Sequence, residues 1–325
     1  MQKGRTRNPL WLKNYAKALV FCTFFLLFAG GMVKSTGSGL AVPDWPLSYG
    51  MLFPPMIGGI FYEHGHRMIA SLVGFMTLLM FFFTLYHEKR RSVKKIAFFC
   101  LLLVIVQGLF GGLTVLFFLP TWISCGHALL AQTFFLSTIF LASCLCDETF
   151  FEPTSLEKKH SKRRSFLLVI SLFLALLYGQ LFLGALVRHT ESGLAIHDFP
   201  LNAGSIIPSF DKEMLQEIND WNFEKDLPYV NMIQVVLHFI HRLGAFVILI
   251  FFTLMTFWIR KYFLKNAKII STLYWIGMGL ILQVMLGAIT VLSMKLPIIA
   301  TLHLLCGAFL MGMTFLMFLR GYRTL

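Results

Sequence analysis

Eight long apolar stretches dominate this sequence of 325 residues. Each is long enough to cross a bilayer as one helix, which needs about 20 residues. They cover residues 15–34, 56–86, 95–118, 121–146, 165–187, 231–259, 268–293 and 296–319. With 57% hydrophobic and 13% charged residues, the chain leaves no candidate soluble domain between them. The sequence therefore predicts an all-α polytopic membrane protein with eight transmembrane helices.

The net charge of +13 would suit a nucleic-acid partner, but its distribution does not. Basic residues cluster in alternate loops and at both ends, at 3–17, 89–95, 158–164, 260–268 and 320–323. Because positively charged loops stay on the cytoplasmic side, we expect both termini to be cytoplasmic and no nucleic acid to bind. No Arg/Ser-rich transit segment precedes the first stretch, which favours the bacterial inner membrane. For a eukaryotic chain we expect the mitochondrial inner membrane.

Two predicted outer loops repeat one another. Residues 33–47 and 187–201 are identical at nine of fifteen positions, at a constant offset of 154. The stretch 107–115 resembles 283–291 at an offset of 176. The chain therefore reads as two tandem four-helix bundles, residues 1–150 and 151–325, related by pseudo-symmetry.

The second outer loop, about residues 188–230, is longer than the first by about twenty-one residues. Within it, Asp211–Asp220 has the pattern of a short amphipathic helix on the outer surface.

Four histidines lie near the outer ends of apolar stretches, at positions that the repeat matches: His66, His127, His241 and His303. Arg67 and Arg242 directly follow two of them. An imidazole can bind a haem iron, and a neighbouring guanidinium can pair with a propionate. Facing helices of a bundle can present two imidazoles to one pocket. A single intramembrane histidine also suits an interhelical hydrogen bond, but four matched histidines favour haem.

The depth of these histidines follows from where their helices begin. If Pro55 and Pro228 mark two helix starts, His66 and His241 lie ten to thirteen residues in. That is about 15–20 Å at 1.5 Å per residue, in the outer half of the membrane.

Glu63 makes the two halves chemically unequal. It precedes His66 by three residues and shares its helix face, whereas the matched position of the second half is His238. An acid at the edge of a membrane is costly and is a functional candidate. We expect the first half to carry out a proton-linked step and the second to hold a haem for electron transfer. The alternative is that Glu63 only pairs with Arg67 or solvent.

These residues resemble a known family. The paired Ser-Gly-Leu-Ala-x-x-Asp-x-Pro-Leu loops, the Tyr-Glu-His-Gly-His-Arg segment at 62–67 and the four histidines are similar to those of haem A synthases, the CtaA/Cox15 family. The resemblance covers essentially the whole chain. It implies an oxidoreductase that converts a methyl group of haem O to the formyl group of haem A for cytochrome oxidase, with oxygen derived from water.

The resemblance also implies roles for individual residues. His66 and His127 would hold the iron of the substrate haem O, and His241 and His303 that of haem b. Glu63 would be the essential acid. Further candidate partners are the membrane lipid, a haem O synthase and a second copy of the chain.

Two other functions fit part of the pattern. A di-haem b-type electron-transfer protein would explain the four histidines but neither the Glu63/His238 difference nor the duplicated outer loops. A transporter is a second alternative, because parallel repeats are common in transporters, but the polar residues gather at the outer ends of the helices and not at the midplane. The chain also departs from some bacterial family members, because none of its six cysteines lies in an outer loop.

Overall fold

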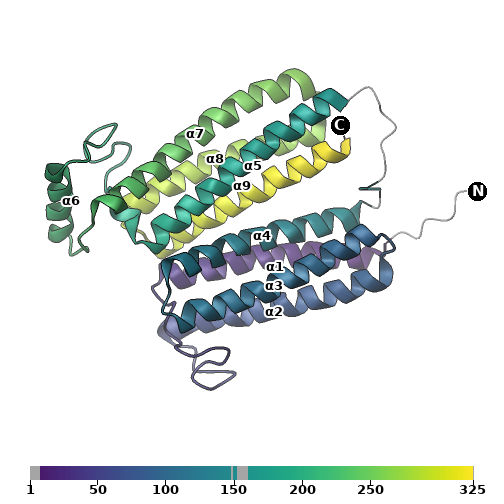
Figure 1. Ribbon diagram of the computed structural model, residues 1–325, viewed down its shortest axis with the longest axis horizontal. Coiled ribbons are helices and arrows are strands. Elements are labelled where there is room, and N and C mark those ends of the chain that lie inside the picture. The colour runs from purple at the N-terminus through teal and green to yellow at the C-terminus, as the bar shows by residue number, and fades with distance from the viewer. Residues whose placement is uncertain (1–7, 148, 152–159, 325) are drawn as a thin grey trace, which may run out of the picture. The chain divides into compact units, whose positions relative to one another are not determined.

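The computed structural model describes residues 8–147, 149–151 and 160–324. Eight of the described helices are long and apolar enough to cross a membrane, which confirms the predicted fold class. They are α1 (Leu10–Ser35), α2 (Gly58–His87), α3 (Arg91–Leu116), α4 (Thr121–Cys146), α5 (His160–His189), α7 (Met232–Phe263), α8 (Ala267–Leu292) and α9 (Pro297–Thr324), as Figure 1 shows. No β-strand is present among the described residues. Two isolated β-bridges occur, one in each of the two repeated loops.

The helix starts follow local chemistry. Pro120 precedes α4 and Pro297 opens α9, positions where the missing N–H of proline is not needed. α7 instead begins with a capping box: the Asn231 side chain accepts from the Gln234 N–H at 3.1 Å, and Gln234 Oε1 accepts from the Asn231 N–H at 2.9 Å.

The predicted starts at the two prolines of the outer loops were wrong. α2 begins at Gly58 and α7 at Met232, in both cases after the proline. His66 and His241 consequently lie eight and nine residues into their helices, about 12–14 Å at 1.5 Å per residue. Both histidines are therefore closer to the outer helix ends than we expected.

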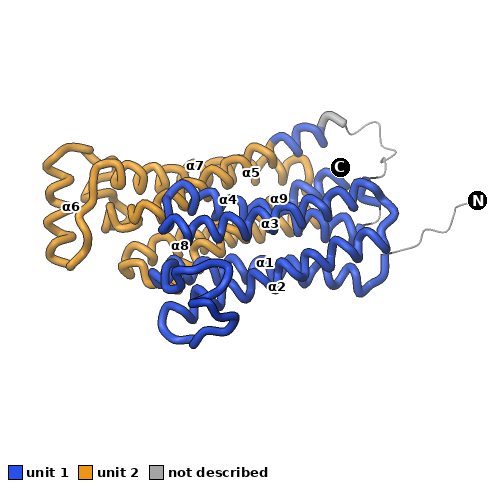
Figure 2. Tube along the Cα trace, turned by 60° about the horizontal axis from the view of Figure 1, so that its bottom comes forward, with its two compact units in different colours: residues 1–168, 315–325 blue, residues 169–314 orange. Residues whose placement is uncertain are grey.

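The chain forms two compact units, residues 1–168 with 315–325 and residues 169–314 (Figure 2). In the first unit, α1 and α3 each pack against both α2 and α4, so that the four helices form a bundle. In the second unit, α7 packs against α8 and against η2 (Ser192–Leu194). The division of the chain at residue 150, the pseudo-symmetry of the halves and the cytoplasmic termini stay predictions.

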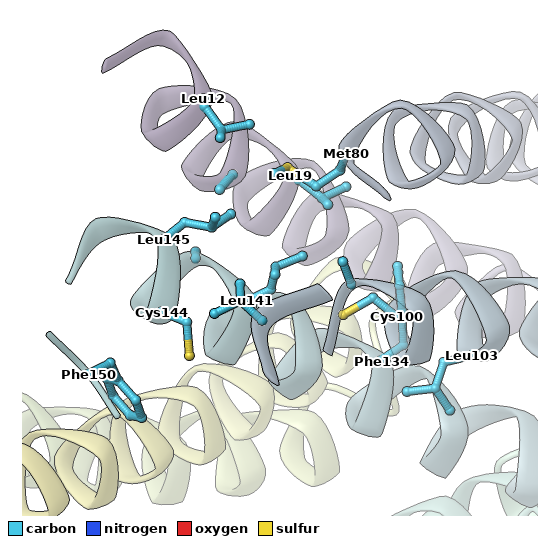
Figure 3. Close-up of a cluster of buried hydrophobic side chains, with 14 of the residues drawn as sticks. Leu12, Leu19, Met80, Cys100, Leu103, Phe134, Leu141, Cys144, Leu145 and Phe150 are labelled. Atoms are coloured by element: carbon cyan, nitrogen blue, oxygen red, sulfur yellow. The ribbon is translucent and has the colours of Figure 1, made fainter. Parts of the chain in front are cut away.

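Buried apolar side chains form the core of the first unit. Figure 3 shows part of this core, including Leu12, Leu19, Met80, Cys100, Phe134, Leu141 and Cys144. Lipid tails are as apolar as leucine, so van der Waals packing, not exclusion of water, holds such helices together. Cys100 and Cys144 are fully buried in this core, and the Cys100 thiol also donates to the Ser137 hydroxyl at 3.3 Å.

The predicted amphipathic helix of the second outer loop is confirmed as α6 (Lys212–Glu224). Asp211 caps it by accepting from the Met214 N–H at 2.8 Å. Met214 and Ile218 pack into a small core with Ile196 and Val235, so α6 is fixed to the loop and to α7. In Figure 1, α6 lies beyond the ends of the long helices of its unit.

Candidate functional site

The carboxylate of Glu63 is buried at the outer end of α2, with 3% of the residue exposed. Its Oε2 accepts a hydrogen bond from the Val42 N–H at 2.8 Å, and its Oε1 accepts one from Arg67 Nη2 at 2.6 Å. The ion pair with Arg67, one of the two roles weighed from the sequence, is therefore present. It fixes the carboxylate and compensates its charge.

Arg67 also ties the first outer loop to α2. Its Nη1 donates to the carbonyl oxygens of Asp44 at 2.7 Å and Leu47 at 2.8 Å, and its Nη2 to that of Val42 at 3.1 Å. No acceptor among the described residues bonds to Arg67 Nε. The predicted contact of Arg67 with a haem propionate stays a prediction.

Arg242 holds the second outer loop in the same way. Its Nη1 donates to the carbonyl oxygens of Asp198 and Leu201, and its Nη2 to that of Ile196, all at 2.9 Å. These three acceptors match those of Arg67 at the sequence offset of 154. The repeated loop sequence therefore encodes a repeated set of carbonyl groups around an arginine.

His238 takes the place of Glu63 in the second half. Its Nδ1 lies 3.2 Å from the Ile196 N–H, and its Nε2 lies 3.2 Å from Nε of Arg242. The loop amide and the arginine that bond to Glu63 thus have direct counterparts around an imidazole. The two halves therefore differ in sequence at this position, and they also differ in the group, carboxylate or imidazole, that accepts from the loop amide and the arginine.

The aspartates of the two loops shape turns. Asp44 accepts from the Tyr49 and Gly50 N–H groups at 2.7 and 2.8 Å, and Asp198 accepts from Ala203 and Gly204 at 2.8 and 2.9 Å. The hydrogen bond from Gly50, followed by that from Tyr49, lowers the pKa of the Asp44 carboxyl. The aspartate of the Asp-x-Pro-Leu motif therefore stabilises a turn in each loop.

The histidines of α7 and α9 lie at a separation that suits an iron between them. The ring centroids of His241 and His303 are 6.4 Å apart, with an interplanar angle of 79°. Two imidazoles that bind one ion from opposite sides, each through a metal–nitrogen bond of about 2 Å, have centroids about 6 Å apart. This pair therefore fits the two axial ligands of a haem.

The histidines of α2 and α4 form the corresponding pair of the first half. His66 of α2 and His127 of α4 both lie in the four-helix bundle of the first unit, where α2 and α4 each pack against α1 and α3. The Nδ1 atoms of both rings are buried and have no hydrogen-bond partner among the described residues. Both residues are half-buried, and their role as ligands of one haem iron stays a prediction.

Each of the four imidazoles packs against a glycine of a neighbouring helix. A Cβ on Gly30 would lie 3.0 Å from His66 Cε1, and one on Gly111 would lie 3.3 Å from His127 Cε1. Gly184 and Gly287 contact His241 and His303 in the same way, at 3.2 and 3.0 Å. The absence of a side chain at these four positions is what leaves room for the rings.

Two of the remaining outer histidines also have specific contacts. His64 Nδ1 lies 2.8 Å from the Ser48 hydroxyl, and both residues are buried. His197 stacks on Trp221 of α6, with centroids 3.9 Å apart and planes 7° apart. Burial lowers the pKa of His197, and the charge of Asp198 partly opposes this.

Comparison with known proteins gives the family. Residues 56–315 match the family model COX15-CtaA, described as cytochrome oxidase assembly protein. The chain belongs to the COX15-CtaA family. The matched range includes Glu63 and all four histidines.

Relatives within the COX15-CtaA family are named Heme A synthase. The chain is 31% identical to that of Halalkalibacterium halodurans over 251 residues, 73% of this chain and 72% of the relative. It is 26% identical to that of Rickettsia bellii strain RML369-C, in a match that covers 89% of this chain and 92% of the relative. It is 25% identical to that of Pelagibacter ubique, in a match that covers 94% of this chain and 95% of the relative.

Sequence reasoning missed two groups of residues in this COX15-CtaA chain. The loop carbonyl oxygens that bond to both arginines carry no side-chain signal. Three glutamines contact the histidines: Gln107, Gln180 and Gln283. Gln107 and Gln283 stand at matched positions of the repeat, which was a usable signal; Gln180 has no such match.

Proposed function

We propose that the chain is a haem A synthase, an oxidoreductase that converts a methyl group of haem O to the formyl group of haem A for cytochrome oxidase. The observation that carries this proposal is the buried Glu63 carboxylate, three residues before His66 in the first half, where the second half has His238. The names of the relatives support the same activity.

The proposed reaction needs a group that handles protons. Converting a methyl to a formyl group with oxygen from water releases four electrons and four protons. Glu63 is the acid in this half that is positioned to accept a proton from the reacting carbon or water, or to stabilise a developing cation. Val42 and Arg67 hold its carboxylate in place during such a step.

The histidines would divide between substrate and cofactor. His66 and His127 would bind the iron of haem O, with Arg67 Nε available to a propionate. His241 and His303 would bind the iron of haem b, whose chemistry when bound is one-electron transfer. Arg242 would lie beside haem b, and Arg67 would lie beside the substrate.

We further propose the setting of this activity. The chain lies in a bacterial inner membrane with both termini cytoplasmic, because its basic loops and ends alternate with outer segments that carry most acids. The histidines then lie in the outer half of the membrane. A haem O synthase and a second copy of the chain are the candidate protein partners.

The function is tested by co-expressing the chain with a haem O synthase in a host that lacks haem A, followed by chromatography of the extracted pigments. Haem A or its hydroxylated precursor is the expected product. If only haem B and haem O are found while the purified protein carries haem, the proposal is wrong, and a di-haem electron-transfer protein takes its place.

A further inference from the structure

The four candidate iron ligands differ in what contacts their Nδ1 atoms. In the second half, His241 Nδ1 lies 3.1 Å from Gln180 Nε2, and His303 Nδ1 donates to the Gln283 carbonyl oxygen at 3.1 Å. In the first half, Nδ1 of His66 and of His127 are both buried without a hydrogen-bond partner among the described residues. His127 of the first half is contacted by Gln107 as well, but at the other ring nitrogen, Nε2, at 3.3 Å. The two halves therefore differ at Nδ1, which has a hydrogen-bond contact on both imidazoles of the second half and on neither of the first.

Gln180 of α5 holds His241 at two points. Its Nε2 contacts Nδ1 of the ring and also donates to the His241 carbonyl oxygen at 2.7 Å. Both the ring and the backbone of the ligand residue are thus fixed by one amide. Side chains that contact the second nitrogen of a ligating histidine set its orientation and basicity.

Around His66, the matched ligand of the first half, the repeat has neither the amide nor the facing glycine. The position that matches Gln180 is Leu26, and the position that matches Gly244 is Ile69. A Cβ on Gly244 would overlap Oε1 of Gln180, so a side chain there would displace the end of the amide from its present position. Leu26 and Ile69 are both partly buried against the apolar core of the first unit. Two differences between the halves, Gln180 against Leu26 and Gly244 against Ile69, therefore accompany the hydrogen bond that His241 Nδ1 has and His66 Nδ1 lacks.

An amide suits both states of a haem ligand. Without iron, the Gln180 NH2 group donates to the unprotonated Nδ1. When Nε2 of an imidazole binds iron, the ring proton is on Nδ1, and an amide that has rotated by 180° accepts from it through its oxygen. This rotation gives up the hydrogen bond to the His241 carbonyl oxygen, because the amide oxygen cannot donate. Leucine can do neither.

We propose that Gln180 is a positioning residue that makes His241 a permanent ligand, and that Leu26 leaves His66 a weaker ligand, suited to a haem that enters as substrate and leaves as product. This inference rests on the proposed function. In this proposal, the hydrogen bond between Gln180 and His241 distinguishes the half that keeps its haem from the half that exchanges it.

The test uses purified full-length protein loaded with haem b in a host without haem O. Gln180→Met removes the hydrogen bonds at similar volume, and Gln180→Glu keeps an acceptor for Nδ1–H. We expect the methionine variant to lose haem to apomyoglobin about 10–100-fold faster than the parent. We also expect its reduced form to bind CO, because a loosened sixth ligand leaves the iron open, whereas the glutamate variant stays close to the parent.

The reverse change tests the same idea in the first half. Leu26→Gln combined with Ile69→Gly should slow the release of haem O by a similar factor. This variant keeps the test decisive if Gln180→Met fails to accumulate in the membrane.

Two further results separate the inference from the proposed function. Unchanged CO binding and haem loss in Gln180→Met, or unchanged haem O release in the double variant, would overturn the role of Gln180 alone. Failure of the parent itself to bind haem b, or equal haem content in the parent and in His241→Ala, would overturn the haem assignment of the second half.

Discussion

Nε of Arg242 lies 3.2 Å from Nε2 of His238, whereas the matched arginine, Arg67, forms an ion pair of 2.6 Å with Glu63. A neutral imidazole accepts a hydrogen bond at only one of its two nitrogens. Because the Ile196 N–H points at the other nitrogen of His238, one of the two donors has no true acceptor there. The arginine of the second half is therefore less well compensated than that of the first.

The first prediction follows directly: His238→Glu should stabilise the protein. A carboxylate can accept from both donors and neutralise Arg242, which we expect to contribute about 1–2 kcal/mol. The midpoint of thermal unfolding should rise by about 2–4 °C, measured in lipid nanodiscs. Glu63→His is the matched control and should lower it. A lower midpoint for His238→Glu would mean that the loop depends on the imidazole.

The second prediction concerns chemistry. Glu63→Gln should leave haem content and membrane level near those of the parent but reduce conversion of haem O at least about 100-fold, because a positioned proton acceptor is lost. Pigment ratios in the co-expression assay measure conversion, and the pyridine haemochrome measures content. Glu63→Asp should retain part of the activity. Full activity of Glu63→Gln would leave the carboxylate with only its role in pairing with Arg67.

A third prediction tests the contact between glycine and imidazole on α5. In Gly184→Ala the new Cβ would lie 3.2 Å from His241 Cε1, so the ring must move, and we expect about a tenfold loss of haem b affinity. Gly179→Ala on the same helix is the control, because no atom lies within 4 Å of a Cβ there. Equal haem content in both variants would show that the ring adapts to the side chain.

The fourth prediction concerns pH at the opposite end of α2. Burial alone would raise the pKa of Glu88, but hydrogen bonds from Arg90 and Asn8 outweigh it and lower this pKa to about 2. The bonds to Glu88 Oε2 are 2.7 Å from Arg90 and 2.9 Å from Asn8. Because the folded pKa is below the unfolded value of 4.5, the stabilisation is complete above pH 4.5 and is lost as the pH falls towards 2.

Glu88→Gln should therefore cost about 2–3 kcal/mol at pH 7, and its difference from the parent should shrink below pH 4.5. Unfolding midpoints measured between pH 3 and 7 give this difference. A constant difference across that range would contradict the assigned pKa.

The sequence predicted the helices well because bilayer thickness sets their length and apolarity marks them. It predicted the chemical inequality of the halves because Glu63 and His238 occupy matched positions. The contact between Gln180 and His241 was not visible, because it joins helices 61 residues apart at a position where the repeat has leucine. The sequence of side chains does not show which backbone carbonyl groups accept hydrogen bonds. It therefore did not show that loop carbonyl oxygens already occupy several N–H groups of Arg67 and Arg242.

The glycines beneath the four imidazoles have a genetic consequence. Every single-base missense change in a glycine codon introduces a residue with a Cβ, and at Gly30, Gly111, Gly184 and Gly287 that atom would meet a histidine ring. In a random missense library, these four codons should therefore tolerate change less well than the codon of Gly179, where a Cβ would meet no atom within 4 Å. Alleles at the four positions would weaken pigment binding by displacing a histidine ring, without removing the histidine.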